Sequence, residues 1–318
     1  MSRTPDSFDE LQPGGLLEWA ELARRDPAYR IAPPRSAWRR WGINLVFFLV
    51  TAGSIYLHGG PRLMLAVLAI LVAHEMGHYL ACRYYGVDAT LPFFIPLPVF
   101  SLIGTLGAFI RIRSPFPHRK ALFDIGIAGP LAGFVVCLPV LLAGALEARV
   151  IETPPADSTD FLSFGEPPLV RWVEAATLGE IPEGKTVLMG PLATAAWFGL
   201  FLTTLNLIPV GQLDGGHVVY ALLGQRAVWI SRIAFLGCLV LLYFRPTWLL
   251  WCVLLFVLGR RHPPTLDDDG PIGRGRVAVG ILGAAVFALC FTPSPFIVSW
   301  DDFWQGLSLL LPAVGSLL

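Results

Sequence analysis

Apolar residues in this chain are collected into long blocks, and polar residues lie mostly in the short stretches between them. Within each block the apolar side chains continue around every face of a helix, which is typical of helices surrounded by lipid. The blocks lie at 41–57, 62–82, 121–146, 188–208, 228–244, 246–259 and 277–291. This pattern predicts an all-α polytopic membrane protein with about six or seven transmembrane helices.

Some of the blocks are shorter than the roughly 20 residues that a perpendicular span needs. We therefore interpret 246–259 and the terminal stretch 303–318 as candidates for half-spans or interfacial segments.

Composition agrees with a membrane protein. Of the 318 residues, 55% are hydrophobic and 14% are charged, and the mean hydropathy is +0.64; a soluble globular protein has more charge and less apolar content. The formal net charge is zero, so net charge identifies no partner. We expect the lipid bilayer as the surroundings and no nucleic acid as a partner. The cysteines lie in apolar blocks without CxxC spacing, which predicts packing residues.

Basic residues between the blocks predict an orientation. Arg35, Arg39 and Arg40 precede the first block, which by the positive-inside rule places the N-terminus in the cytoplasm. Successive crossings then place the basic stretch 111–120 inside and the acidic stretch 147–185 outside. One orientation therefore satisfies every loop.

Two segments interrupt the helical pattern. Segment 89–112 is apolar, but Pro92, Pro96 and Pro98 preclude a regular helix there. Its Val, Ile and Phe residues around glycines favour a membrane-associated β-hairpin, whose backbone must be covered by protein or line a watery cavity. The acidic segment 147–185 has many prolines and little periodicity, so we predict a loose extracytoplasmic loop.

These features divide the chain into three parts. They are a cytoplasmic N-terminal segment at 1–40, a membrane core at 41–225 that contains the hairpin and the loop, and additional C-terminal membrane helices at 226–318. The pattern gives no role for the C-terminal part. Its "DDDG" stretch at 267–270 lacks the remaining ligands of a calcium loop, and we interpret it as a solvated linker.

The stretch "HEMGH" places ionisable residues inside the block 62–82. In a helix, His74 and His78 lie one turn apart on one face, the spacing with which two imidazoles bind one zinc ion. Glu75 would lie beside the metal and take a proton from the attacking water. Ionisable residues in a membrane helix cost on the order of 3 kcal/mol each, which indicates a function. The alternative is that they only form hydrogen bonds with neighbouring helices.

A catalytic zinc usually has three protein ligands and one open position. The best third candidate is Asp214 in "NLIPVGQLDGGHV" at 206–218, where proline and glycines end the preceding span and free Asp214 to point inward. The alternative role for Asp214 is a helix N-cap at the start of 214–224. We expect His217 to support a ligand rather than to be one, because a fourth protein ligand would close the site.

Small residues within the block 121–146 predict close helix packing. Gly129 and Gly133 in "AGPLAG" lie about one turn apart on one face. We therefore expect a neighbouring helix to pass close to them.

The paired motifs "HEMGH" and "NLIPVGQLDGG" resemble those of the site-2 protease family of intramembrane zinc metalloproteases. The resemblance covers roughly residues 60–225. It includes "GTLGAFIRIRSPFPHRKALFDIGIAGPLAGF" at 104–134, which is similar to the bacterial, cyanobacterial and chloroplast branch, and the core spans leave no room for a PDZ domain. The resemblance implies one zinc ion per chain held by His74, His78 and Asp214, with Glu75 as general base and Asn206 holding or polarising the substrate backbone.

The resemblance further implies an intramembrane endopeptidase that cleaves single-span membrane proteins or their remnants, in a bacterial cell membrane. It implies that the hairpin at 89–112 binds substrate by strand addition, since an unwound substrate has unpaired amides that a strand edge can satisfy. The alternative is a polytopic transporter or metal-handling protein in which the same residues form a cation or proton path. Such a path has no need of a glutamate beside the first histidine. The sequence leaves the substrate and the oligomeric state open.

Overall fold

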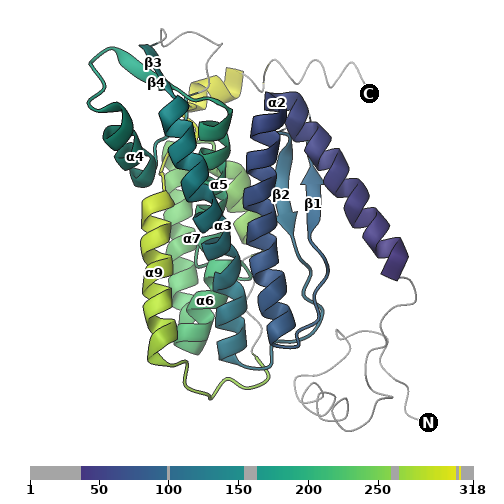
Figure 1. Cartoon of the computed structure of the whole chain (residues 1–318). Helices are drawn as coiled ribbons and strands as arrows, with labels where there is room; N and C mark the ends of the chain where they lie inside the picture. The colour runs from purple at the N-terminus through teal and green to yellow at the C-terminus, as the bar shows by residue number, and fades with distance from the viewer. Residues whose placement is uncertain (1–36, 99–100, 154–162, 259–264, 306–307, 309–318) are drawn as a thin grey trace, which may run out of the picture.

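The computed structural model describes residues 37–98, 101–153, 163–258, 265–305 and 308. These residues form a helical bundle with two small pairs of strands (Figure 1). The apolar blocks form helices because a backbone surrounded by lipid must satisfy its own hydrogen bonds. All five cysteines are buried, which agrees with their predicted role as packing residues.

The first long helix, α2 (Ala37–Tyr84), consists of two arms. The arms meet at Gly59 and Gly60, which leave the helical conformation, and Gly60 has a φ of 72°, a left-handed value that glycine adopts readily. Pro61 follows the break and suits the first turn of the second arm. In Figure 1 the first arm diverges from the bundle and the second runs back inside it. The two predicted blocks therefore form separate arms.

Four further helices follow predicted blocks: α3 (Arg119–Glu147), α5 (Pro191–Leu207), α7 (Ala227–Phe244) and α8 (Trp248–Leu258). A fifth, α9 (Arg274–Cys290), covers most of the block 277–291. α6 (Asp214–Leu223) and the short 3-10 helix η3 (Gly224–Arg226) lie between two blocks, in the stretch where the sequence allowed a helix at 214–224. α3 contacts α2, α5, α6 and α9, which makes it the central helix. Buried residues of α9, among them Val286 and Cys290, share one apolar core with those of α3 and α5.

Three helical stretches of the described chain are long and apolar enough to cross a membrane. They are Gly42–Tyr84, Arg119–Glu147 and Asp214–Phe244. α5 and most of α8 form shorter apolar helices. The mostly helical membrane architecture is confirmed, whereas the count of six or seven spans stays a prediction. The N-terminal segment 1–40 and the terminal stretch 303–318 lie mostly outside the described residues.

The predicted β-hairpin within 89–112 is confirmed. Its strands β1 (Phe93–Pro96) and β2 (Thr105–Phe109) pair antiparallel, with an irregularity in register between Ile95 and Pro96. The first arm of α2 holds the hairpin: Asn44 Nδ2 donates to the carbonyl oxygens of Leu91 at 3.0 Å and Pro92 at 2.8 Å. The hairpin therefore lies against α2 (Figure 1).

The prediction of a loose loop at 147–185 is wrong. Strands β3 (Arg149–Glu152) and β4 (Lys185–Leu188) pair antiparallel at the two ends of this segment, and helix α4 (Pro168–Leu178) lies between them. The strands are too short to give a visible period in the sequence. Pro168 begins α4 because a proline at the first helical position loses no hydrogen bond. Proline there marks a helix start.

Candidate active site

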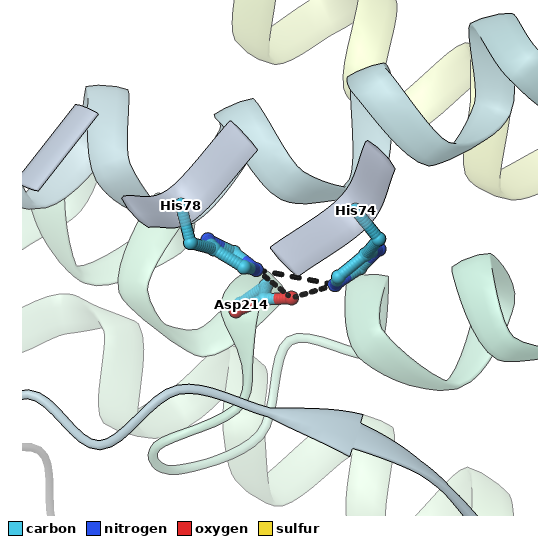
Figure 2. Close-up of side chains that lie close together, drawn as sticks. All are labelled: His74, His78 and Asp214. Atoms are coloured by element: carbon cyan, nitrogen blue, oxygen red, sulfur yellow. Dashed lines mark hydrogen bonds and ion pairs between the residues drawn. The ribbon is translucent and has the colours of Figure 1, made fainter. Parts of the chain in front are cut away.

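His74 and His78 project from the second arm of α2 toward Asp214, the first residue of α6 (Figure 2). The two imidazole Nε2 atoms are 3.1 Å apart. Asp214 Oδ2 lies 3.4 Å from His74 Nε2 and 3.2 Å from His78 Nε2. Both histidines are buried, and the ligand atoms of all three residues lie within 4.8 Å of one another. The structure therefore brings the three predicted ligands together.

Asp214 does not cap its helix. The N-cap residue of α6 is Leu213, and Asp214 occupies the first turn with its carboxylate turned to the histidines. The chain reverses between α5 and α6, and a Cβ at Gly215 or Gly216 would overlap the carbonyl groups of Leu207 or Gly211. The glycines are needed because this turn packs backbone against backbone.

α3 forms the wall behind the histidines. The carbonyl oxygen of Ile125 accepts a hydrogen bond from His78 Nδ1 at 2.7 Å. A Cβ at Gly129 would overlap the His78 ring, and one at Gly133 would lie 3.2 Å from His74 Cβ. Close packing at these glycines is as predicted. The sequence could not show that the two candidate ligand imidazoles themselves fill this space, because that depends on how α2 and α3 pack together.

The three residues fit a divalent metal ion. Because His78 Nδ1 donates to Ile125, the Nε2 lone pair of His78 points into the cluster. The Asp214 carboxylate is also an acceptor, and His74 Nε2 accepts when its proton is on Nδ1, so a cation can satisfy all three groups at once. Ligands of a tetrahedral zinc ion lie roughly 3.3 Å apart, close to the 3.1–3.4 Å separations found here. Imidazole and carboxylate are ordinary zinc ligands.

Glu75 and Asn206 complete the site. Both line a cavity of about 130 Å³ that also contains His74. Glu75 is 4% exposed, and Asn206 Nδ2 lies 3.1 Å from His74 Nε2. The rest of the lining is mainly apolar and includes residues 106–108 of β2 and Trp251 of α8. The five predicted site residues therefore share one place in the fold.

His217 stays outside the ligand cluster of the described residues. Its ring packs 5.5 Å from that of Phe116, and its backbone N–H donates to the carbonyl oxygen of Leu213. This position agrees with the expectation that His217 is not a ligand.

A cluster that could hold a metal ion, between helices apolar enough to cross a bilayer, is typical of a membrane-embedded metalloprotein. Residues 62–242 match the model of peptidase family M50, and the chain belongs to that family. The site-2 protease resemblance is thereby confirmed.

Curated relatives carry names that agree with this family. The rice "Probable zinc metalloprotease EGY1, chloroplastic" is 34% identical over 253 residues, covering 76% of this chain and 41% of the relative. The Arabidopsis "Probable zinc metalloprotease EGY2, chloroplastic" is 29% identical over 305 residues, covering 87% and 53%. The Arabidopsis EGY1 protein of the same description is 32% identical, covering 76% and 44%. The chain thus spans only two fifths to half of the length of these relatives.

Proposed function

We propose that this protein is an intramembrane zinc endopeptidase that hydrolyses peptide bonds in transmembrane segments of other membrane proteins. The observation that carries the proposal is the convergence of His74, His78 and Asp214 in one cluster, with His74 and the neighbouring Glu75 lining the adjoining cavity. Family membership and the zinc metalloprotease names of the relatives support it. The cation-path alternative explains neither Glu75 at this place nor the family match.

Each site residue has a role in the proposed reaction. His74, His78 and Asp214 would hold the zinc ion. When bound, zinc supplies Lewis-acid chemistry that makes a water molecule more acidic and polarises a carbonyl. Glu75 accepts a proton from the attacking water and delivers it to the nitrogen of the leaving amine, which balances the hydrolysis. Glu75 is buried, which limits the contact of its carboxyl group with bulk solvent.

Asn206 and β2 would position the substrate. The Asn206 amide group faces the cluster and can donate to a carbonyl of the substrate backbone. Within the described sheet, β2 pairs only with β1, so its other edge can receive an extended segment. Residues 106–108 of β2 line the same cavity as Glu75. A substrate strand added there would run past the general base, with its amides satisfied.

The membrane location follows from the apolar helices, and its sidedness stays a prediction. The relatives are named as chloroplastic, so they do not support the bacterial cell membrane expected from the sequence. The single-span substrates and the cytoplasmic N-terminus remain parts of the proposal.

Cleavage of a defined substrate tests the proposal. Purified protein in detergent is incubated with a panel of single-span model proteins, and mass spectrometry locates the cut. We expect cuts inside the transmembrane segment, inhibited by a zinc chelator and absent with Asp214→Ala. The exposed Glu152→Gln variant in β3 serves as a matched control and should cleave like wild type. Cuts confined to soluble parts of the substrates, or cleavage by Asp214→Ala, would contradict the proposal.

A further inference from the structure

A second group of polar contacts lies where α3 and α9 begin and α2 ends. Arg276, in the first turn of α9, donates from Nε to Asp124 Oδ1 at 2.9 Å and from Nη2 to Asp124 Oδ2 at 2.6 Å. The same Nη2 donates to Tyr85 Oη at 3.1 Å, and the Tyr85 hydroxyl donates to Asp124. A bidentate ion pair therefore joins α3 to α9, and the Tyr85 hydroxyl connects the end of α2 to both residues.

This ion pair differs from the others near the molecular surface. The side chains of Arg276 and Asp124 are each 30% exposed, whereas those of Arg171 and Glu166 are 68% and 49% exposed and share one contact at 3.2 Å. A partly buried pair with two parallel hydrogen bonds fixes geometry, while an exposed single contact contributes little.

The segment before α9 makes a second set of contacts through Asp268. Its carboxylate accepts hydrogen bonds from Tyr220 Oη of α6 at 2.7 Å and from Thr265 Oγ1 at 2.6 Å. Arg119, at the start of α3, donates to the Asp268 carbonyl oxygen at 3.2 Å and to the Ala221 carbonyl oxygen at 2.8 Å. The interpretation of "DDDG" as a solvated linker is therefore wrong at Asp268, because folding brings its partners from distant helices.

Each set of contacts involves a helix that holds or orients a proposed metal ligand. Asp124 is followed by Ile125, whose carbonyl oxygen holds His78 Nδ1. Tyr220 belongs to the short helix that Asp214 begins. One segment, Thr265–Arg276, thus touches the helix that orients His78 and the helix that supplies Asp214. It lies beyond residues 62–242, which match the family model.

We propose that Thr265–Arg276 acts as a strap that positions the metal ligands, with Arg276 and Asp268 as positioning residues. Arg276 holds the first turns of α3 in place, and these turns carry the Ile125 carbonyl group that orients His78. Asp268 holds α6 against the start of α3, which sets the distance from Asp214 to the histidines. The inference rests on the proposed zinc site, and it gives the C-terminal part of the chain a role there.

The test measures zinc affinity and protein stability together. Full-length Arg276→Gln and Asp268→Asn are purified in detergent, and zinc affinity is measured by competition with a chromogenic chelator. We expect zinc binding to weaken about 10-fold, the lower end of the effect of losing a group that hydrogen-bonds a ligand, because Arg276 and Asp268 act on the ligands through a further residue. The absorption spectrum of the cobalt-loaded protein should change as the ligand geometry loosens. Arg171→Gln, which breaks the exposed pair, is the control and should bind like wild type.

Further variants separate positioning from general stability. Asp124→Asn combined with Arg276→Gln should weaken zinc binding no more than either change alone, because the two residues act as one pair. Arg276→Lys should restore part of the affinity. If Arg276→Gln does not fold, Arg276→Lys and Tyr85→Phe provide the measurement. A lower melting temperature with unchanged zinc affinity and cobalt spectrum would overturn the strap's positioning role. A wild-type protein that binds no zinc would instead overturn the proposed function.

Discussion

At the scale of single residues, the site depends on a glycine without a side chain as much as on the side chains of the candidate ligands. His78 can stand between α2 and α3 only because position 129 has no side chain. Gly129 therefore belongs to the metal site although it offers no ligand atom.

Gly129→Ala should impair the zinc site directly. The added methyl group overlaps the His78 ring, so the imidazole must turn away from Asp214 or α3 must move. We expect zinc affinity to fall at least about 10-fold and cleavage to be lost. Metal titration and a cleavage assay check this. Gly237→Ala in α7, where the methyl group meets nothing within 4 Å, is the control. Equal zinc affinity in the two variants would refute this account of Gly129.

The site residues were predictable where local spacing determines geometry. One helical turn places His74 and His78 on one face, and the glycine turn marks Asp214 as a residue free to leave helical packing. The contact between Gly129 and His78 depends on how α2 and α3 cross, which a single sequence does not reveal. The hydrogen bond from His78 to the Ile125 carbonyl group was also not predictable, because every residue has a backbone carbonyl group.

At the scale of elements, apolar blocks identified most of the helices, since a lipid-surrounded helix needs little more than continuous hydrophobicity. They missed α4, which lies in a proline-rich, acidic segment. Strands β3 and β4 were not predicted, because they are short and pair with each other across a long stretch of chain. The β1–β2 hairpin was predictable because proline excluded a helix over a continuous apolar stretch.

Loosening the β1–β2 hairpin from α2 should weaken substrate binding more than it weakens zinc binding. Asn44→Ala removes two hydrogen bonds to the backbone before β1, each worth about 1 kcal/mol. We expect KM for a membrane substrate to rise roughly 5-fold or more, with zinc content unchanged. Steady-state kinetics and metal analysis check this, with Leu45→Ala on the exposed face of the same arm as control. Loss of zinc from Asn44→Ala would show that the hairpin supports the metal site instead.

α4 should make stability depend on pH. Burial, with a smaller effect of Glu166, raises the pKa of Glu174 from an ordinary 4.5 to about 7. Between these values the unfolded chain loses this proton first, so the free energy of unfolding falls as pH rises. The effect should be small because the carboxyl group is only partly buried.

Glu174→Gln removes that titration. The melting temperature of the variant should exceed that of the wild type by an amount that grows between pH 4.5 and about 7. Above about pH 7 the difference between the two melting temperatures should stay constant. Melting curves across this range check the prediction. Parallel pH profiles for the two proteins would contradict the raised pKa.

At the scale of the whole molecule, α3 organises the bundle. It forms the wall behind both histidines, its residue Asp124 accepts hydrogen bonds from Arg276 of the strap, and its first residue, Arg119, donates to the Ala221 carbonyl oxygen of α6. The C-terminal helices are therefore part of one folded unit around the site. The sequence could not indicate this role, because Asp268 and Arg276 look like ordinary polar residues between two apolar blocks.

The central claim is that a buried glutamate beside a three-ligand zinc site hydrolyses peptide bonds inside a membrane. The most direct test measures zinc per chain and cleavage of a single-span substrate for wild type, Glu75→Gln and Asp214→Ala. We predict that wild type binds one zinc and cleaves, that Glu75→Gln keeps zinc but loses cleavage, and that Asp214→Ala loses both. Absence of zinc from the wild type, or cleavage that survives Glu75→Gln, would contradict the claim.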